Sequence, residues 1–456
     1  MSSERLQDNK MGVMPVGRLL VNMALPVIIS MVVQALYNVV DTIYVSQVSE
    51  SAVTALSLAF PIQNLQIGFA VGIGTGVNSW LSKSLGERNP EEANRAAGNG
   101  LVLMAFATAL FVIFGLFFTR PYFAIQSQNP QTVEDGVIYT KICSLFSLGL
   151  FVQIWGERLL QSTGRTMYTM VIQGVGALVN IILDPVFIHG WFGIPAMGIA
   201  GAAVATVLGQ WVGGILAVYC ALRRNPEVSV RKRYWKLNRR TVTAILAVGI
   251  PGILMNGIGS IMNFGMNQIL QNFAEAATGV FGVYFKLQSF FFMPLFGMNS
   301  AAISILAFNY GARKPQRIQK TLALACGSGL TLMVVGLVAF QLVPDLLLGM
   351  FNPTPTFLAM GRVALRTISW SLPMAAVSII LGASFQALGN GLYATVVTLC
   401  RQLVVLLPVA WLMSLTGSLD KVWIAFPIAE TVSCILTAYF FVKIYRQKIK
   451  PMYQVS

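Results

Sequence analysis

The sequence has 456 residues, of which 56% are apolar and only 10% are charged. Soluble domains carry about one quarter charged residues, so this composition excludes a water-soluble globular protein. The net charge of +15 would suggest nucleic acid in a soluble protein, but cytoplasmic loops of membrane proteins also collect Lys and Arg, and we expect no nucleic-acid partner. The single histidine, His189, excludes a His-pair metal site. The five cysteines are scattered, which argues against a zinc site or a disulfide framework. No cofactor or enzymatic activity is expected.

Apolar stretches long enough to cross a bilayer follow one another along the whole chain. Twelve are predicted, near residues 18–46, 53–82, 94–119, 133–160, 166–189, 195–222, 241–271, 277–309, 317–343, 356–386, 391–414 and 420–445. Eight Lys and Arg lie between Arg223 and Arg240, after the sixth span. The charge pattern places both termini in the cytoplasm. We expect an N-terminal bundle (1–222), a basic cytoplasmic linker (223–240), a C-terminal bundle (241–446) and a cytoplasmic tail (447–456).

An internal repeat becomes visible when the chain is shifted by 225 residues. Pro26 then meets Pro251, and the loop 86–90 meets the loop 311–315 without a gap. Each half has six predicted spans, so both halves enter the membrane in the same direction. The sequence therefore predicts an all-α membrane protein with two parallel, pseudo-symmetric six-helix bundles around a central cavity, which is typical of an alternating-access transporter.

Polar side chains follow one face of the first predicted span, at helical spacing, and end in a carboxylate. They are Ser30, Gln34, Tyr37, Asn38 and Asp41. The fifth span repeats the device with Gln173, Asn180 and Asp184. An ionisable residue inside a bilayer is costly and usually functional, although each Asp could instead bond a neighbouring helix.

The second half has apolar residues at the equivalent places. Under the shift, the counterparts of Asp41, Asn180 and Asp184 are Met266, Val405 and Val409. The fold does not require carboxylates there, so we predict an ion-coupling site at Asp41, Asn180 and Asp184. Two buried carboxylates can take up and release a proton, and with the Asn180 carbonyl they could equally hold sodium, so both ions remain open.

Other polar residues inside spans have structural alternatives. Asn256, Asn263 and Asn267 form a stripe on the seventh span that is predicted to line the substrate cavity or to bond neighbouring helices. Arg401 and Glu430 are predicted to form a structural ion pair. Glu157 is interpreted as an interfacial acid beside Arg158. Pro26 is predicted to be a hinge, with a static bend as the alternative.

The chain resembles the MATE (multidrug and toxic compound extrusion) family over essentially its whole length. The resemblance rests on Pro26, the segment from Gln34 to Asp41, the two matched loops, and Asn180 with Asp184. Asp41, Asn180 and Asp184 are similar to the ion site of the prokaryotic branch with DinF and MepA-like members, in the MOP flippase superfamily. Some members place a threonine in the sixth helix, where this chain has Ala202, with Thr206 one turn further on.

The resemblance implies an antiporter that exports cationic or amphipathic organic compounds in exchange for protons or sodium. It further implies that Met31, Gln34, Tyr37, Asn38 and Tyr139 line the substrate cavity. We expect a monomer in contact with membrane lipid, in the plasma membrane of a prokaryote. The alternative is a flippase for a lipid-linked or polysaccharide precursor, whose anionic cargo would call for a basic cavity.

Overall fold

The computed structural model describes residues 9–273, 275–351 and 354–454, and these contain helices but no strand. The predicted N-terminal residues 1–8 and the last two tail residues lie outside the described residues. Within these described ranges, ten helices are long and apolar enough to cross a membrane, and the number of spans rises to twelve if each of two bent pairs counts as one. The main helices of the first half are α2 (Lys10–Val13), α3 (Val16–Ser46), α4 (Glu50–Gly86), α5 (Pro90–Phe117), α6 (Thr119–Gln126), α7 (Pro130–Leu145), α8 (Leu148–Ser162), α9 (Thr166–His189) and α10 (Ile199–Arg223).

The second half repeats this order with nearly constant spacing. Its helices are α11 (Arg239–Gln271), α12 (Glu275–Gly311), α13 (Pro315–Leu342), α14 (Pro344–Gly349), α15 (Pro355–Ser369), α16 (Leu372–Ala387), α17 (Gly391–Leu399), α18 (Leu407–Ser414), α19 (Leu419–Val422) and α20 (Ala425–Ile444). The bounds of α12 and α13 are those of α4 and α5 shifted by 225 residues. Even the strained turn residues correspond, since Arg88 has a φ of 57° and Arg313 a φ of 53°. The predicted pair of pseudo-symmetric six-span bundles is therefore confirmed.

Two predicted spans are not single helices. The stretch 133–160 is built from α7 and α8 with a bend of 47°, and the stretch 356–386 from α15 and α16 with a bend of 46°. In the second pair Pro373 follows the break, and a proline cannot supply the backbone N–H that would continue the helix. In the first pair the break is followed by Gly149, where a Cβ atom would lie 2.8 Å from the Trp211 ring.

The eleventh predicted span, 391–414, also differs from a plain α-helix. A π-helical segment, Cys400–Leu406, joins α17 to α18 and contains Arg401. At the C-terminal end, α20 continues through the π-helical segment Tyr445–Ile449 into the 3₁₀ turn Lys450–Gln454. The part of the predicted tail that the structure describes, 447–454, is therefore helical.

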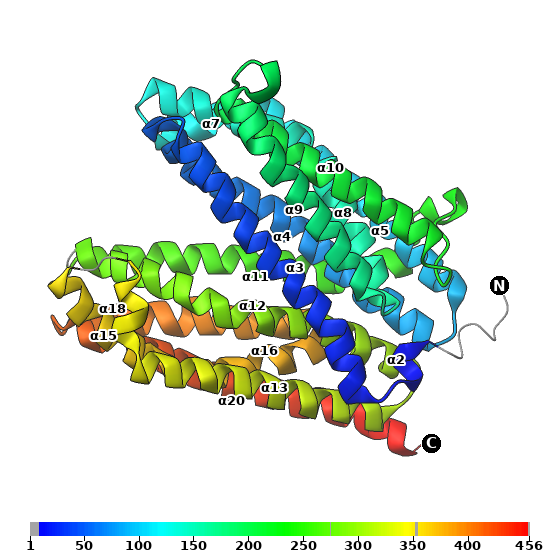
Figure 1. The fold of residues 1–456 in the computed structure, drawn as a ribbon. Coiled ribbons are helices and arrows are strands. Elements are labelled where there is room, and N and C mark those ends of the chain that lie inside the picture. Colours follow the sequence, from blue (N-terminus) through cyan, green and yellow to red (C-terminus); the bar gives the residue numbers. More distant parts are fainter. Residues whose placement is uncertain (1–8, 274, 352–353, 455–456) are drawn as a thin grey trace.

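The two bundles form a V in Figure 1, with α3 to α10 in one arm and α11 to α20 in the other. The arms lie close together at the end where both termini lie, called the termini end below, and splay apart at the opposite end near α7 and α15. The first helix of each bundle packs on the second helix of the other, α3 on α12 and α11 on α4. Helix α3 thus crosses from the second bundle at its start to the first bundle at its end.

Two glycines related by the repeat let α4 and α12 touch at the termini end. A Cβ atom on Gly86 would lie 2.0 Å from the carbonyl oxygen of Phe308, and one on Gly311 would lie 2.1 Å from that of Lys83. No real Cβ fits at such distances, so only glycine allows this approach. The pseudo-twofold axis therefore passes between these two helix ends.

A hydrogen-bond network joins the bundles in the same region. Asn78 on α4 is fully buried, and its Oδ1 accepts from the hydroxyls of Ser162 at 2.9 Å and of Ser304 on α12 at 3.0 Å. Arg158 on α8 donates to the hydroxyl of Ser300 on α12 at 2.7 Å. These contacts between α4 or α8 and α12 hold the arms together at the termini end.

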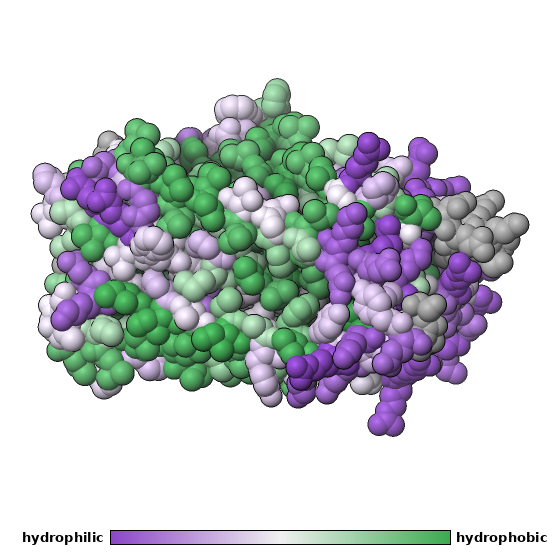
Figure 2. Space-filling view, turned by 90° about the horizontal axis from the view of Figure 1, so that it is seen from below, coloured by the Kyte–Doolittle hydropathy of each residue, from purple (hydrophilic) through white to green (hydrophobic). Residues whose placement is uncertain are grey.

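The segment between the bundles is held in place. It contains the short 3₁₀ helix η2 (Lys232–Trp235), and the side chain of Asn99 on α5 donates to the carbonyl oxygens of Tyr234 at 2.9 Å and Lys236 at 3.1 Å. Figure 2 shows hydrophobic residues over the middle of one face and hydrophilic residues gathered at the termini end. Such a band is what a bilayer-spanning protein presents to lipid.

Candidate functional site in the first bundle

The predicted carboxylates come from two neighbouring helices of the first bundle. Asp41 on α3 is 7% exposed and Asp184 on α9 is fully buried. Helices α3 and α9 pack along each other, which brings the ends of the two polar stripes together.

Asn180 connects Asp184 to the next helix. Its Nδ2 lies 3.4 Å from Asp184 Oδ1 and 3.4 Å from the hydroxyl of Thr206 on α10. Thr206 thus supplies a hydroxyl from the sixth span, whereas Ala202 is fully buried and apolar. Asn180 Nδ2 is therefore engaged on both sides, and its own carbonyl oxygen remains available.

Three buried oxygens at this place have no hydrogen-bond partner among the described residues: Asp41 Oδ1, Asn180 Oδ1 and Asp184 Oδ2. A buried polar atom without a partner is costly, so such a cluster calls for a ligand that supplies the missing interactions. A proton on a carboxylate would turn one acceptor into a donor, and a sodium ion would be held by hard oxygen ligands. Oxygens of this kind suit either ion.

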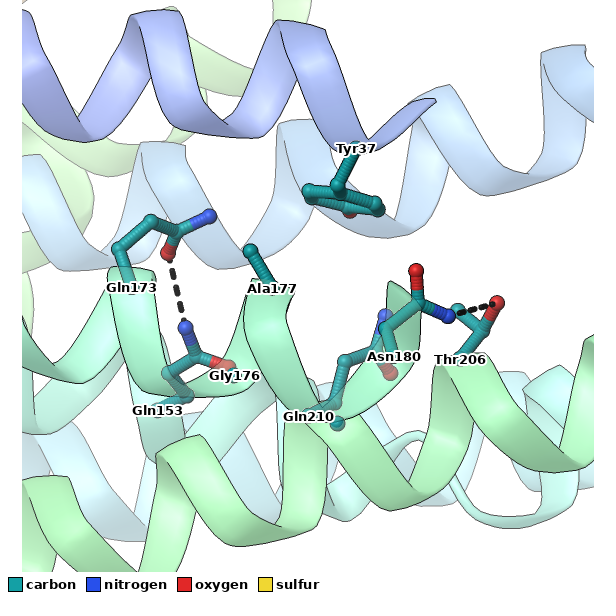
Figure 3. A pocket seen from close by; sticks show the side chains of 9 residues that line it. Tyr37, Gln153, Gln173, Gly176, Ala177, Asn180, Thr206 and Gln210 are labelled. Atoms are coloured by element: carbon teal, nitrogen blue, oxygen red, sulfur yellow. Dashed lines mark hydrogen bonds between the residues drawn. The ribbon is translucent and has the colours of Figure 1, made fainter. Parts of the chain in front are cut away.

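A pocket lies beside this cluster, between α3, α8, α9 and α10 (Figure 3). Its volume is about 30 Å³, which leaves room for water. In Figure 3 the Tyr37 ring faces the side chains of Asn180 and Ala177 across the pocket. The polar residues that line it are Tyr37, Gln153, Gln173, Asn180, Thr206 and Gln210.

The other residues predicted for the substrate cavity are placed around α3. Met31 and Gln34 are half-buried, whereas Asn38 is exposed and does not line this pocket. Tyr139 is 1% exposed, and its hydroxyl accepts from Gln63 on α4 at 2.9 Å. The structure therefore places Tyr139 beneath the surface, behind the site.

The amide stripe on α11 is not part of this pocket. Asn256 is exposed and donates to the Gly252 carbonyl at 2.9 Å, while Asn263 and Asn267 are half-buried. Their helix belongs to the other arm of the V. Asn256 lies beside α4, since a Cβ on Gly68 would be 3.2 Å from Asn256 Cβ.

The predicted ion pair lies in the second bundle. Arg401 Nη1 is 3.3 Å from Glu430 Oε1, and the two side chains are 18% and 14% exposed. Pro26 lies in the interior of α3 and is buried. The structure thus brings together Arg401 with Glu430 and Asn180 with Asp184, and it places Asp41 on the helix that packs along α9.

Gln153 and Gln210 were not predicted to belong to the site. Both lie in apolar spans, and their counterparts under the 225-residue shift are Ser378 and Ile435. The same comparison between halves that singled out Asp41 therefore contains a signal for these two glutamines, weaker because an amide is cheaper to bury than a carboxylate.

Known proteins resemble this chain over its whole length. The family model described as MatE matches residues 26–186 and 251–412. An FAD transporter of Shewanella oneidensis is 26% identical over 93% of this chain and 94% of its own, and a probable multidrug resistance protein, YoeA, of Bacillus subtilis is 25% identical over 98% of each. The outward-facing structure of a multidrug resistance MATE family transporter of the MOP superfamily superposes with a TM-score of 0.88 at 24% identity, covering 96% of this chain and 97% of its own.

Proposed function

The chain belongs to the MatE family of membrane transporters, and from this premise we propose that it exports cationic or amphipathic organic compounds in exchange for protons or sodium. The family's members are transporters rather than enzymes and need no cofactor. Relatives named as multidrug resistance or multidrug export proteins support a role in efflux.

The observation that carries the proposal is the cluster of unpartnered oxygens on Asp41, Asn180 and Asp184 beside the pocket. A cation that enters the first bundle gains from ionised carboxylates, whereas a bound proton or sodium ion neutralises them. Substrate and coupling ion therefore compete, and each must lower the affinity for the other. Competition of this kind is sufficient for exchange when the two faces of the protein open in turn.

The placement in the cell follows from charge. We propose that the chain is a monomer in the plasma membrane of a prokaryote, with both termini in the cytoplasm. The segment 223–240 and the loops 86–90 and 311–315, which carry Lys and Arg, lie at the termini end in Figure 1, and Figure 2 shows hydrophilic residues gathered at that end. This arrangement fits the excess of Lys and Arg on cytoplasmic loops.

An anionic cargo is the second candidate, because one relative is an FAD transporter. FAD carries two phosphates, and a precursor-flipping relative would likewise bind phosphate. The ionisable residues at the first-bundle site are carboxylates, which repel such cargo. We therefore favour the cation.

The purified chain in proteoliposomes tests the proposal. When a pH or sodium gradient is imposed, a cationic dye should be transported in the direction opposite to the flow of protons or sodium, and FAD should not be transported. Dye affinity should fall when protons or sodium are added. A dye affinity that stays flat across both series, or movement of FAD without movement of dye, would reject cation exchange at this site.

A further inference from the structure

Glu157 on α8 is a carboxylate within a predicted span that the proposed exchange does not use. It is half-buried, and its Oε1 accepts from Gln153 Nε2 at 3.1 Å. Arg158 is its neighbour in the chain, but the hydrogen bonds of the Arg158 guanidinium go to other residues. Arg158 Nη1 donates to Gln161 Oε1 at 2.9 Å and to the Ser300 hydroxyl. The Glu157 carboxylate is thus hydrogen-bonded by Gln153, and the interpretation of Glu157 as an interfacial acid beside Arg158 stays a prediction.

Glu157 is joined to the pocket by one amide. Gln153 Nε2, which donates to Glu157, also donates to Gln173 Oε1 at 2.8 Å, and both glutamines line the pocket (Figure 3). Gln173 precedes Asn180 by two turns, about 10 Å nearer to the start of α9. Because α9 starts at the termini end, Glu157 lies on that side of the pocket and the cluster at Asp184 lies on the other.

The repeat shows that the fold does not need an acid at this place. The counterparts of Glu157, Gln153 and Gln173 in the second half are Gly382, Ser378 and Thr398. Helix α16 forms with Gly382 in its interior, as α8 forms with Glu157. The acid and both amides are thus particular to the bundle that holds the carboxylate site, as Asp41 and Asp184 are.

Glu157 also lies next to the contact that closes the termini end. Gln161, one helical turn further along the same face, accepts from the Ser300 hydroxyl of the other bundle at 3.1 Å. When the arms separate there, this contact must break, and Glu157 gains access to water. Helices α4, α5, α9, α10 and α12 pack against α8. Their charged residues are Glu50 and Lys83 on α4, Glu91, Glu92 and Arg95 on α5, Asp184 on α9, Arg223 on α10, and Glu275 and Lys286 on α12.

We propose that Glu157 is a third proton-carrying group, the last stop of the coupling proton on its way to the termini end. This inference rests on the proposed exchange and commits it to protons. In the step, an O–H bond on the Asp41 or Asp184 carboxyl breaks and an O–H bond on Glu157 forms, with water in the pocket carrying the proton between them. Glu157 then releases the proton to water once the Arg158–Ser300 contact has opened, and both carboxylates are left ionised for the next substrate.

The test varies the pH independently on the two sides of proteoliposomes that hold the chain in one orientation. For the unaltered chain, dye transport should depend on the pH at both faces. Glu157→Gln should lose the dependence on pH at the termini end and run about a hundredfold slower or more, as expected for removing one proton-transfer group. It should keep the dependence on pH at the opposite face, and its dye affinity should be unchanged.

Glu157→Asp keeps a carboxylate and should restore the dependence at the termini end. Glu50→Gln, which removes an exposed carboxylate at the start of α4, should leave both dependences as they were. The proposal is overturned if Glu157→Gln keeps the dependence on pH at both faces or loses dye affinity. It is also overturned if Glu157→Asp behaves like Glu157→Gln. Transport that follows sodium and ignores pH in the unaltered chain would also overturn it while leaving cation exchange intact, whereas absence of any gradient-driven dye transport would reject the proposed function itself.

Discussion

Thr166, the first residue of α9, donates its hydroxyl to the backbone carbonyl of Asn22 on α3 at 3.3 Å. That carbonyl would normally accept from the residue four positions later, but this residue is Pro26, which has no N–H. A side chain from another helix thus serves the carbonyl that the proline leaves free. In the second half, Pro251 corresponds to Pro26 and Gly391 corresponds to Thr166. Gly391 has no hydroxyl to donate, so the second half lacks this contact.

Pro26→Ala should slow transport while making α3 more stable. Alanine restores the backbone bond to Asn22, competes with Thr166 and removes a helix-interior proline that costs about 3 kcal/mol. If α3 bends during exchange, a straighter helix hinders it. Dye transport and helix stability should be compared with Pro251→Ala, which alters a bundle without the carboxylates and should have the smaller effect. Equal rates for Pro26→Ala and the unaltered chain would mean that the proline is a static bend.

Asp41→Asn should abolish gradient-driven transport without preventing insertion. The amide keeps the size of the side chain, but it cannot exist in two charge states. The helix loses an intramembrane carboxylate that costs about 2.5–3.5 kcal/mol on insertion scales, so expression should be normal or better. Efflux in proteoliposomes should fail for Asp41→Asn and Asp184→Asn and persist for Met266→Leu, the counterpart of Asp41. Full activity in Asp41→Asn would remove this site from the mechanism.

The sequence predicted the carboxylate site because cost and symmetry both point to it. A buried Asp needs a reason, and the apolar counterparts Met266 and Val409 show that the helices themselves do not supply one. The spans were predictable from the sequence, since their apolar length fixes them. The bends after Phe146 and Trp370 and the π-helical segment were not, because they depend on how neighbouring helices pack.

Asn78→Ala should loosen the closed termini end. The substitution removes the acceptor of the Ser162 and Ser304 hydroxyls, and the loss of hydrogen bonds worth about 1 kcal/mol each should lower the melting temperature. The arms should also separate more often. In a background without the native cysteines, Ala301→Cys, a buried position on α12 beside Ser300, should then react faster with an impermeant thiol reagent. Gln268→Ala, at an exposed position of α11, serves as the control and should change neither quantity.

The Arg401–Glu430 pair predicts a non-additive pattern of stability. Replacing one partner leaves a poorly solvated charge without its counter-charge, so Arg401→Met or Glu430→Leu alone should cost about 3–5 kcal/mol. The double variant leaves no charge and should regain most of that loss. Thermal melting of the four proteins gives the coupling energy. Additive losses would contradict a paired, structural role.

Glu227, in the segment between the bundles, predicts a pH dependence of stability. Its Oε2 accepts from Asn9 at 2.5 Å, and Arg165 lies 3.9 Å from Oε1. Burial nevertheless raises the pKa of Glu227 above its ordinary value of 4.5. A raised carboxyl pKa means that the folded protein prefers the protonated form, so stability should fall as the pH rises through this titration. Between about pH 4 and pH 7, the melting temperature should fall less for Glu227→Gln than for the unaltered chain. The control Glu50→Gln should show the same fall as the unaltered chain. Parallel curves for all three proteins would exclude Glu227 as the cause.

The contacts between the arms often end on backbone atoms. Ser79 on α4 donates to the carbonyl oxygens of Gln386 and Ala387, and Arg317 on α13 donates to those of Met11 and Met14. A carbonyl oxygen is present whatever the side chain, so one side of each contact cannot be lost by substitution. Homologous genes can therefore diverge at positions 11, 14, 386 and 387 and still encode the same closure, and a sequence comparison at those positions would underestimate how well it is preserved.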